Sequence, residues 1–144
     1  MDYAQLYQLI NLIALVPWLL LFIAPRWVFT QRLVYSFAFV LLFCSLYLVL
    51  FSLNFDVLGG GGTDGGSFAT LAGLKLLFQS DAALVIGWTH YLAFDLFVGI
   101  WEVRDAQEKG IAHYWLIPCL LLTLMAGPIG FLLYWLVQYL HGKR

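Results

Sequence analysis

Four long apolar stretches constrain the fold of this chain more than any other feature. They cover about residues 6–24, 33–55, 82–103 and 114–140, and a membrane-spanning helix needs roughly 20 such residues. Only 10% of the 144 residues are charged, whereas a soluble domain carries about 25%. So few charges cannot cover a water-facing surface. We therefore predict an all-α integral membrane protein, a four-transmembrane-helix bundle forming a single domain over residues 1–144.

The charge and residue content argue against several functions and features. The formal net charge of −1 provides no basic face, so we expect no nucleic-acid partner. The first residues lack a basic n-region, so we expect the first apolar segment to be retained as a span. Cys44 and Cys119 both fall inside apolar runs and are interpreted as packing residues. The three histidines form no His-x-x-x-His pair, so we predict no metal and no soluble cofactor.

The segment between the second and third apolar stretches has two parts. Residues 59–66 are a glycine-rich run without the Lys-Ser/Thr ending of a phosphate-binding loop, and we interpret them as a flexible linker. Residues 68–78 are apolar, but they are interrupted by Lys75 and are too short to span a bilayer. They are predicted to form a short interfacial or re-entrant helix between spans 2 and 3.

The last apolar stretch contains Gly127 followed by Pro128 near its middle. Proline has no amide hydrogen and clashes with the preceding turn, so we predict one helix over 114–140 that bends at this point. The bend is expected to open space near the level of Asp95. Four spans place both termini on one side. The basic residues divide four against three between the two sides, and this difference slightly favours termini outside the cytoplasm.

Asp95 is the most unusual residue of the third span, because its surroundings are apolar enough to lie in a membrane. An ionised carboxylate near mid-bilayer costs several kcal/mol, so such residues usually face a protein interior. One interpretation is a structural contact with Asn11, Thr123 or a tyrosine. Another is a solvated edge position. The third is a carboxylic acid held neutral by its apolar setting, which can donate a proton.

The third span carries two stripes of notable residues when it is placed on a helical wheel. The first consists of His90, Phe94, Phe97 and Trp101, and the second of Trp88, Tyr91, Asp95 and Glu102. The stripes lie about 120–140° apart, so His90 and Asp95 share a site only if a cavity reaches both. His90 is interpreted either as a satisfied helix histidine or as an acid–base residue or ligand. At the end of the span, Glu102, Arg104, Asp105 and Glu108 form either a solvated helix end or a network at the mouth of a site.

The segments around Asp95 and Pro128 resemble a known family. The run Gly-Trp-Thr-His-Tyr-Leu-Ala-Phe-Asp-Leu-Phe-Val-Gly at 87–99 and the run Pro-Cys-Leu-Leu-Leu-Thr-Leu-Met-Ala-Gly-Pro-Ile-Gly at 118–130 are similar to the neoxanthin synthase family, also called abscisic-acid-deficient-four-like. The resemblance is most specific over about residues 87–134. Plant members are chloroplast membrane proteins needed to convert violaxanthin, a carotenoid epoxide, to neoxanthin. We expect no transit peptide, because the first residues are not rich in arginine, and this expectation favours a bacterial relative in the inner (plasma) membrane.

The resemblance implies an isomerase embedded in the membrane, acting on a carotenoid or a related isoprenoid polyene without a cofactor. We assign Asp95 as the catalytic acid and His90 as the base. The substrate-binding candidates are Trp88, Tyr91, Phe94, Trp101 and Thr123. The alternatives are a non-enzymatic module that binds a pigment, a lipid or a partner protein, and a haem or metal protein that uses His90. The expected partners are the lipid bilayer and a carotenoid or isoprenoid ligand, and the chain can also form a homo-oligomer.

Overall fold

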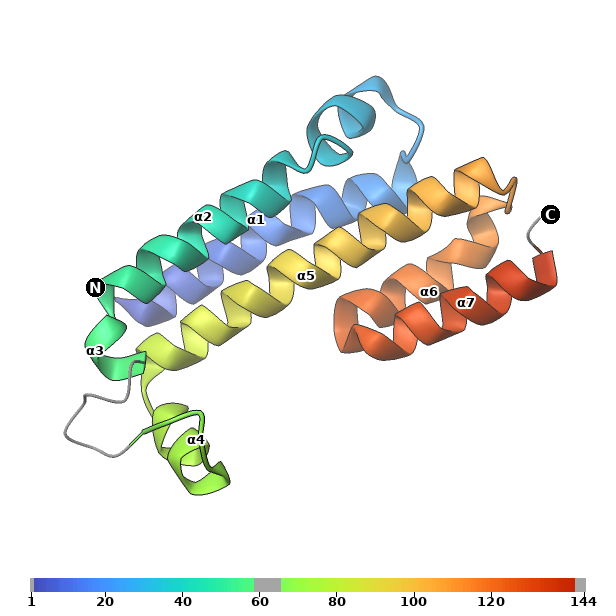
Figure 1. The fold of residues 1–144 in the computed structure, drawn as a ribbon. Coiled ribbons are helices and arrows are strands. Elements are labelled where there is room, and N and C mark those ends of the chain that lie inside the picture. The colour runs from blue at the N-terminus through green and yellow to red at the C-terminus, as the bar shows by residue number, and fades with distance from the viewer. Residues whose placement is uncertain (1, 59–65, 142–144) are drawn as a thin grey trace.

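The computed structural model describes residues 2–58 and 66–141, and these residues form helices and connecting loops with no β-strand among them (Figure 1). The all-α prediction is therefore confirmed for the described part of the chain. The elements are α1 (Tyr3–Ile23), the π-helix η1 (Thr30–Val34), α2 (Ala38–Leu53), α3 (Phe55–Leu58), α4 (Leu71–Leu77), α5 (Asp81–Glu108), α6 (His113–Ala126) and α7 (Pro128–His141). The predicted glycine-rich linker falls on residues 59–66, of which 59–65 lie outside the described residues.

Three stretches are long and apolar enough to cross a membrane: α1, the stretch Thr30–Leu53 that joins η1 to α2, and α5. The chain is therefore a membrane protein by length and composition. The central element is α5, because α1, α2 and α6 all pack along it. One close approach requires glycine: a Cβ on Gly99 would lie 2.7 Å from Cη2 of Trp18. The bare backbone at this position lets the buried indole of α1 lie directly on α5.

The C-terminal part of the chain differs from the predicted single bent helix over 114–140. It forms two helices, α6 and α7, which lie side by side in Figure 1 and pack closely on each other. The rings of Trp115 and His141 stack with centroids 4.2 Å apart, so the end of α7 returns to the beginning of α6. Between the helices, Gly127 has φ 31° and ψ −86°. Pro128 then starts a new helix at a position where a missing amide hydrogen costs little.

Neither arm of this hairpin is long enough to cross a bilayer. Each has 14 residues, which at 1.5 Å per residue gives about 21 Å, whereas the hydrocarbon core is about 30 Å thick. The four-span count is therefore not confirmed. The hairpin begins and ends near the end of α5 (Figure 1). The segment predicted as interfacial or re-entrant forms α4, a helix of seven residues capped by Thr70, whose Oγ1 accepts the Gly73 amide at 3.0 Å.

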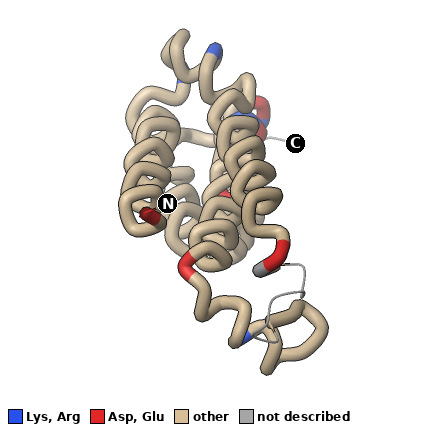
Figure 2. Tube along the Cα trace, turned by 90° about the vertical axis from the view of Figure 1, so that its left-hand side faces the viewer, with Lys and Arg blue, Asp and Glu red and all other residues tan. Residues whose placement is uncertain are grey.

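Charged residues gather mainly at the two ends of the long helices (Figure 2). Of the described Lys and Arg residues, Arg26, Arg32, Arg104 and Lys109 lie in or beside the connections that follow α1 and α5, and Lys75 lies in α4 at the opposite end. A topology with only these three crossing stretches would put Tyr3 and His141 on opposite sides of the membrane, whereas the predicted four spans put them on one side. The positive-inside rule then favours a cytoplasmic location for the end where α5 finishes.

Thiol labelling distinguishes the hairpin from a fourth span. We expect Glu108→Cys and His141→Cys to react with a membrane-impermeant thiol reagent from one side of sealed vesicles, and Gln5→Cys from the other. The background replaces Cys44 and Cys119 with alanine, so that each variant has one thiol. Labelling of residues 5 and 141 from the same side would contradict the hairpin and restore the four-span topology.

The closest approach of the two arms occurs at Gly130. A Cβ there would lie 2.1 Å from both the backbone nitrogen and Oγ1 of Thr123, and a backbone atom cannot rotate away. We expect Gly130→Ala to destabilise the protein by about 1–3 kcal/mol through overpacking, even though alanine gains about 1 kcal/mol in helix propensity. The measurement is a melting curve in detergent. The control is Ile129→Ala, one residue earlier and 58% exposed, and equal melting of the two variants would show that the arms do not pack as described.

Candidate functional site

Asp95 lies near the middle of α5 and faces the tip of the α6–α7 hairpin. A Cβ on Gly127 would lie 2.6 Å from Oδ1 of Asp95, so the carboxyl group is in direct contact with the turn between the two arms. The side chain is only 8% exposed. Its Oδ2 is buried and has no hydrogen-bond partner in the described part of the chain. The turn therefore covers a buried carboxyl group that no described side chain neutralises.

The hairpin tip requires a glycine for two independent reasons. Its positive φ at Gly127 is costly for residues with a Cβ, and a side chain at this position would collide with Asp95. The end of α6 and the start of α7 meet here, so backbone groups that lack helical partners converge on the site. Non-helical backbone at membrane depth is tolerated where protein buries it, and broken helices commonly form binding sites for charged or polar groups.

A second buried acid, Glu102, lies two turns further along α5. It is 0% exposed, and the hydroxyl of Thr123 on α6 lies 3.0 Å and 3.1 Å from its two carboxyl oxygens. From the sequence, Glu102 is predicted as part of the charge cluster at the end of the span and not as a site residue. The sequence feature that could have identified Glu102 is its position on the same helical-wheel stripe as Asp95. Two residues that are seven positions apart differ by only about 20° in direction around a helix.

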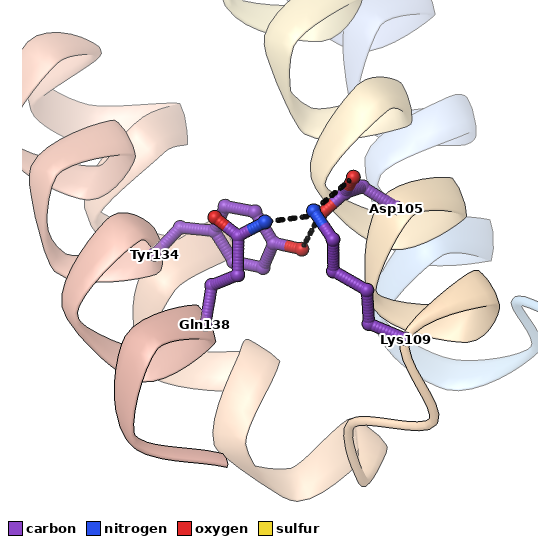
Figure 3. Close-up of polar contacts among 4 residues, drawn as sticks. All are labelled: Asp105, Lys109, Tyr134 and Gln138. Atoms are coloured by element: carbon purple, nitrogen blue, oxygen red, sulfur yellow. Dashed lines mark hydrogen bonds and ion pairs between the residues drawn. The ribbon is translucent and has the colours of Figure 1, made fainter. Parts of the chain in front are cut away.

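The third acid on this side of α5, Asp105, links the end of α5 to α7 (Figure 3). Lys109 Nζ lies 2.7 Å and 2.8 Å from its carboxylate oxygens. Gln138 Nε2 donates a hydrogen bond of 3.2 Å, and the buried Tyr134 hydroxyl also donates to the same carboxylate. The charge cluster is predicted from the sequence to be either a solvated helix end or a polar network. Asp105 takes part in a network, whereas Arg104 and Glu108 are exposed at the helix end.

The three carboxyl groups form a line along the hairpin-facing side of α5. The axial rise from Asp95 to Glu102 is about 10.5 Å, and from Glu102 to Asp105 about 4.5 Å. Their contacts change along this line. Asp95 touches the hairpin tip, and Glu102 binds one hydroxyl. Asp105 forms an ion pair with Lys109. The line therefore runs from the middle of the longest helix to its polar end.

His90 lies on a different side of α5. It is exposed at its position on the helix, and its ring packs on Phe94 and Tyr47, with centroids 4.7 Å and 5.6 Å away. It borders a cavity of about 240 Å³ with residues of α2 and the α4 region, such as Phe51 and Phe78. Asp95 does not line this cavity. The structure thus brings Phe94 and His90 together and separates both from the acid, in agreement with the helical wheel.

The other predicted binding residues divide between two places. Trp88 stacks on Tyr91 with centroids 5.6 Å apart, and its indole donates a 3.0 Å hydrogen bond to Asn11 on α1. Asn11 and Thr123 are predicted from the sequence as possible contacts of Asp95. Instead, Asn11 is hydrogen-bonded to Trp88, and Thr123 is hydrogen-bonded to Glu102. Trp101 meets Tyr134 edge-on at 5.5 Å, beside the Asp105 network. No group of three or more His, Cys, Asp or Glu side chains within residues 2–58 and 66–141 is arranged to hold a metal ion.

These features define a small helical membrane protein with a buried carboxyl site under a helical hairpin. The chain belongs to the ABA DEFICIENT 4-like family, whose family model matches residues 5–134. The matched region extends from α1 into α7 and includes Asp95, Glu102 and the hairpin tip. No curated protein and no solved structure matches the chain. The family resemblance drawn from the two sequence runs is therefore confirmed.

Proposed function

We propose that this protein is an isomerase of the inner (plasma) membrane of a bacterium, acting on a carotenoid or a related isoprenoid polyene by acid–base chemistry. The observation that carries the proposal is the carboxyl group of Asp95, buried under the hairpin tip with Oδ2 unpartnered. Tyr91 interacts with this carboxyl group, but a purely structural aspartate would be expected to use both oxygens in hydrogen bonds, because unmade bonds are costly in a dry interior. A neutral acid in this position retains a proton that it can donate.

The substrate class comes from the family resemblance, and a carotenoid epoxide suits such an acid. Asp95 donates its proton to the epoxide oxygen, the C–O bond breaks, and its electron pair remains on the oxygen as a hydroxyl group. A carbocation develops on the polyene. A base then removes a proton from the neighbouring carbon, and the C–H electrons form the additional double bond of an allene. Substrate and product contain the same atoms, so the step needs no oxidant or reductant.

The aromatic residues before Asp95 provide support for the cation. Tyr91 precedes Asp95 by four residues and therefore lies on the same side of α5, and its ring is stacked on Trp88. Aromatic faces attract positive charge, with about 0.5–2 kcal/mol per contact depending on solvent exposure. His90 remains the proposed base. Its ring faces Tyr47 of α2, on a different side of α5 from Asp95, whereas the proton to be removed lies on the carbon next to the bond that Asp95 opens. The Asp95 carboxylate left by the first step is therefore the alternative base.

A second candidate function is a non-enzymatic module that binds a pigment or a lipid. The supporting observation is a cavity of about 450 Å³ between α1 and α5, lined by residues such as Tyr3, Tyr7 and Trp88 and not by Asp95. Pockets of this size and apolar character hold small ligands without chemistry. Retention of a carotenoid without conversion by the purified wild-type protein would favour this candidate over the isomerase.

Asp95→Asn tests the acid directly. The amide keeps the shape of the side chain but has no acidic proton, so we expect conversion of a carotenoid epoxide in liposomes to fall about 10²- to 10⁴-fold. Products are separated by chromatography, and melting curves report stability. Asp81→Asn is the matched control, because Asp81 is an exposed residue in the first turn of the same helix. A stable, fully active Asp95→Asn protein would overturn the proposed function.

His90→Gln tests the base independently. Glutamine keeps a polar side chain beside Tyr47 and Phe94 but does not accept a proton at neutral pH, so we expect a loss of about 10²-fold or more in conversion. Carotenoid retention is measured on the same samples, since removal of the ring also removes two aromatic contacts. Full activity of the variant would exclude His90 as the base and would leave the carboxylate of Asp95 to take up the carbon-bound proton.

A further inference from the structure

A small cavity lies at the charged end of α5, where this helix faces the start of α2. Its volume is about 250 Å³. Asp95 and His90 do not line it, so it is separate from the residues of the proposed reaction. One wall comes from the residue before α2 and the other from five residues of α5: Phe37, Phe97, Trp101, Arg104, Asp105 and Glu108.

The wall formed by α5 changes from apolar to charged toward the end of the helix. Phe97, Trp101, Arg104 and Glu108 are spaced by three or four positions, so they form one stripe of the helix. Tryptophan is enriched where a membrane meets water. The aromatic part of the stripe therefore belongs to the hydrocarbon side, and the charged part belongs to the level of the lipid headgroups.

Arg104 and Glu108 provide one unpaired charge of each sign. The ion pair found in the described part of the chain joins Lys109 to Asp105, so the charge of Asp105 is already compensated. Arg104 and Glu108 are both exposed and form no ion pair with each other. A cation four residues before an anion is the less favourable order for a pair on one helix. The cavity thus offers a free cation and a free anion with no net charge.

The opposite wall is held in an unusual backbone conformation. Phe37 lies between η1 and α2 and has φ 61° and ψ 17°, a left-handed conformation that is rare for a bulky side chain. Its ring stacks on Phe97 with centroids 5.4 Å apart. Unfavourable backbone conformations and π-helical segments such as η1 are frequent at ligand-binding sites. The unfavourable backbone at Phe37 therefore accompanies the aromatic pair at the apolar end of the cavity.

We propose that this cavity binds a phospholipid of the phosphatidylethanolamine class. Arg104 donates to the phosphate oxygens, because a guanidinium group matches the geometry of phosphate. Glu108, one turn closer to the end of the helix, accepts hydrogen bonds from the primary ammonium, which lies beyond the phosphate in this headgroup. The acyl chains extend along Trp101 and Phe97. The order of groups along α5 is therefore the order of groups in the lipid.

The two free charges select this headgroup over other common ones. An anionic headgroup without an ammonium would satisfy Arg104 but would leave Glu108 beside a negative phosphate, and like charges that meet at an interface are unfavourable. The quaternary ammonium of phosphatidylcholine has no N–H group to donate to Glu108. A bound lipid of the proposed class satisfies both side chains and joins the start of α2 to the end of α5.

Melting curves measure the headgroup preference. The full chain in detergent is titrated with phosphatidylethanolamine, phosphatidylcholine or phosphatidylglycerol that carry identical acyl chains. We expect half-maximal stabilisation by phosphatidylethanolamine at a concentration about tenfold lower than for the other two, the effect of one charge-assisted hydrogen bond. Equal stabilisation by all three lipids, or the strongest stabilisation by phosphatidylglycerol, would overturn the proposed site.

Charge variants test the two contacts separately. In Arg104→Gln and in Glu108→Gln, the phosphatidylethanolamine concentration for half-maximal stabilisation is expected to rise about tenfold. Glu108→Gln should also lose the distinction from phosphatidylcholine. The matched control is Arg32→Gln, which removes an exposed positive charge at the same end of the molecule and should keep the preference. An equal loss in this control would show a general charge effect and overturn the site.

An exchange of the two charges tests their order. Arg104→Glu combined with Glu108→Arg keeps the net charge but places the anion where the phosphate would bind. We expect this double variant to lose the preference for phosphatidylethanolamine. An unchanged preference would overturn the proposed orientation of the lipid, because the order of charges along α5 would then have no effect.

Photocrosslinking locates the lipid without any substitution. A phosphatidylethanolamine with a diazirine in its acyl chain should label the segments that contain Phe37 and residues 97–101, as identified by mass spectrometry of peptides. Excess unlabelled phosphatidylethanolamine should suppress this labelling, and phosphatidylcholine should not. Equal labelling of exposed side chains of α1, such as Leu12 and Leu19, would overturn the site. None of these measurements uses a carotenoid, so their outcome is separate from that of the proposed function.

Discussion

The reversal of the chain at Gly127 is the constraint on which the candidate site depends. A positive φ at this glycine and the missing amide of Pro128 end α6 and begin α7 within one residue. The reversal brings Gly127 against Asp95, Thr123 against Glu102 and Tyr134 against Asp105. A continuous bent helix would carry its second half away from α5 and leave the outer carboxyl groups of α5 without these partners. The turn thus sets both the depth of the hairpin and the environment of all three acids.

Two of these acids, Asp95 and Glu102, are poor choices for stability alone. Carboxyl groups inside a membrane protein are expensive even when neutral, because their oxygens must leave water. Asp105 offsets this cost with an ion pair and donors from α7, and Glu102 offsets part of it through one hydroxyl. The compensation decreases toward the interior, where Asp95 Oδ2 has no partner in the described part of the chain. Incompletely compensated buried carboxyl groups of this kind are concentrated at functional sites.

The division of α5 into sides also affects how a long polyene would be held. The side toward α2 presents His90 with Phe94 and Tyr47. Trp88 faces α1 through its hydrogen bond to Asn11, and Tyr91, which stacks on Trp88, lies on the same side of α5 as Asp95. The carboxyl groups occupy the side toward the hairpin. In the proposed reaction, a polyene bound at Asp95 would contact the aromatic faces of Tyr91 and Trp88 rather than the rings that surround His90.

The three crossing stretches were predictable from the sequence alone, because every backbone polar group in hydrocarbon must be bonded within its own helix and long apolar runs satisfy this condition. Helical periodicity also placed Asp95 and Glu102 on one stripe and His90 on another. The sequence could not distinguish a bend from a reversal at Gly127–Pro128, since both outcomes use the same local chemistry. The tertiary structure decided this through the close packing of Gly130 on Thr123. It also decided the burial of Glu102, because an acid near a helix end is solvated unless another part of the chain, here α6, covers it.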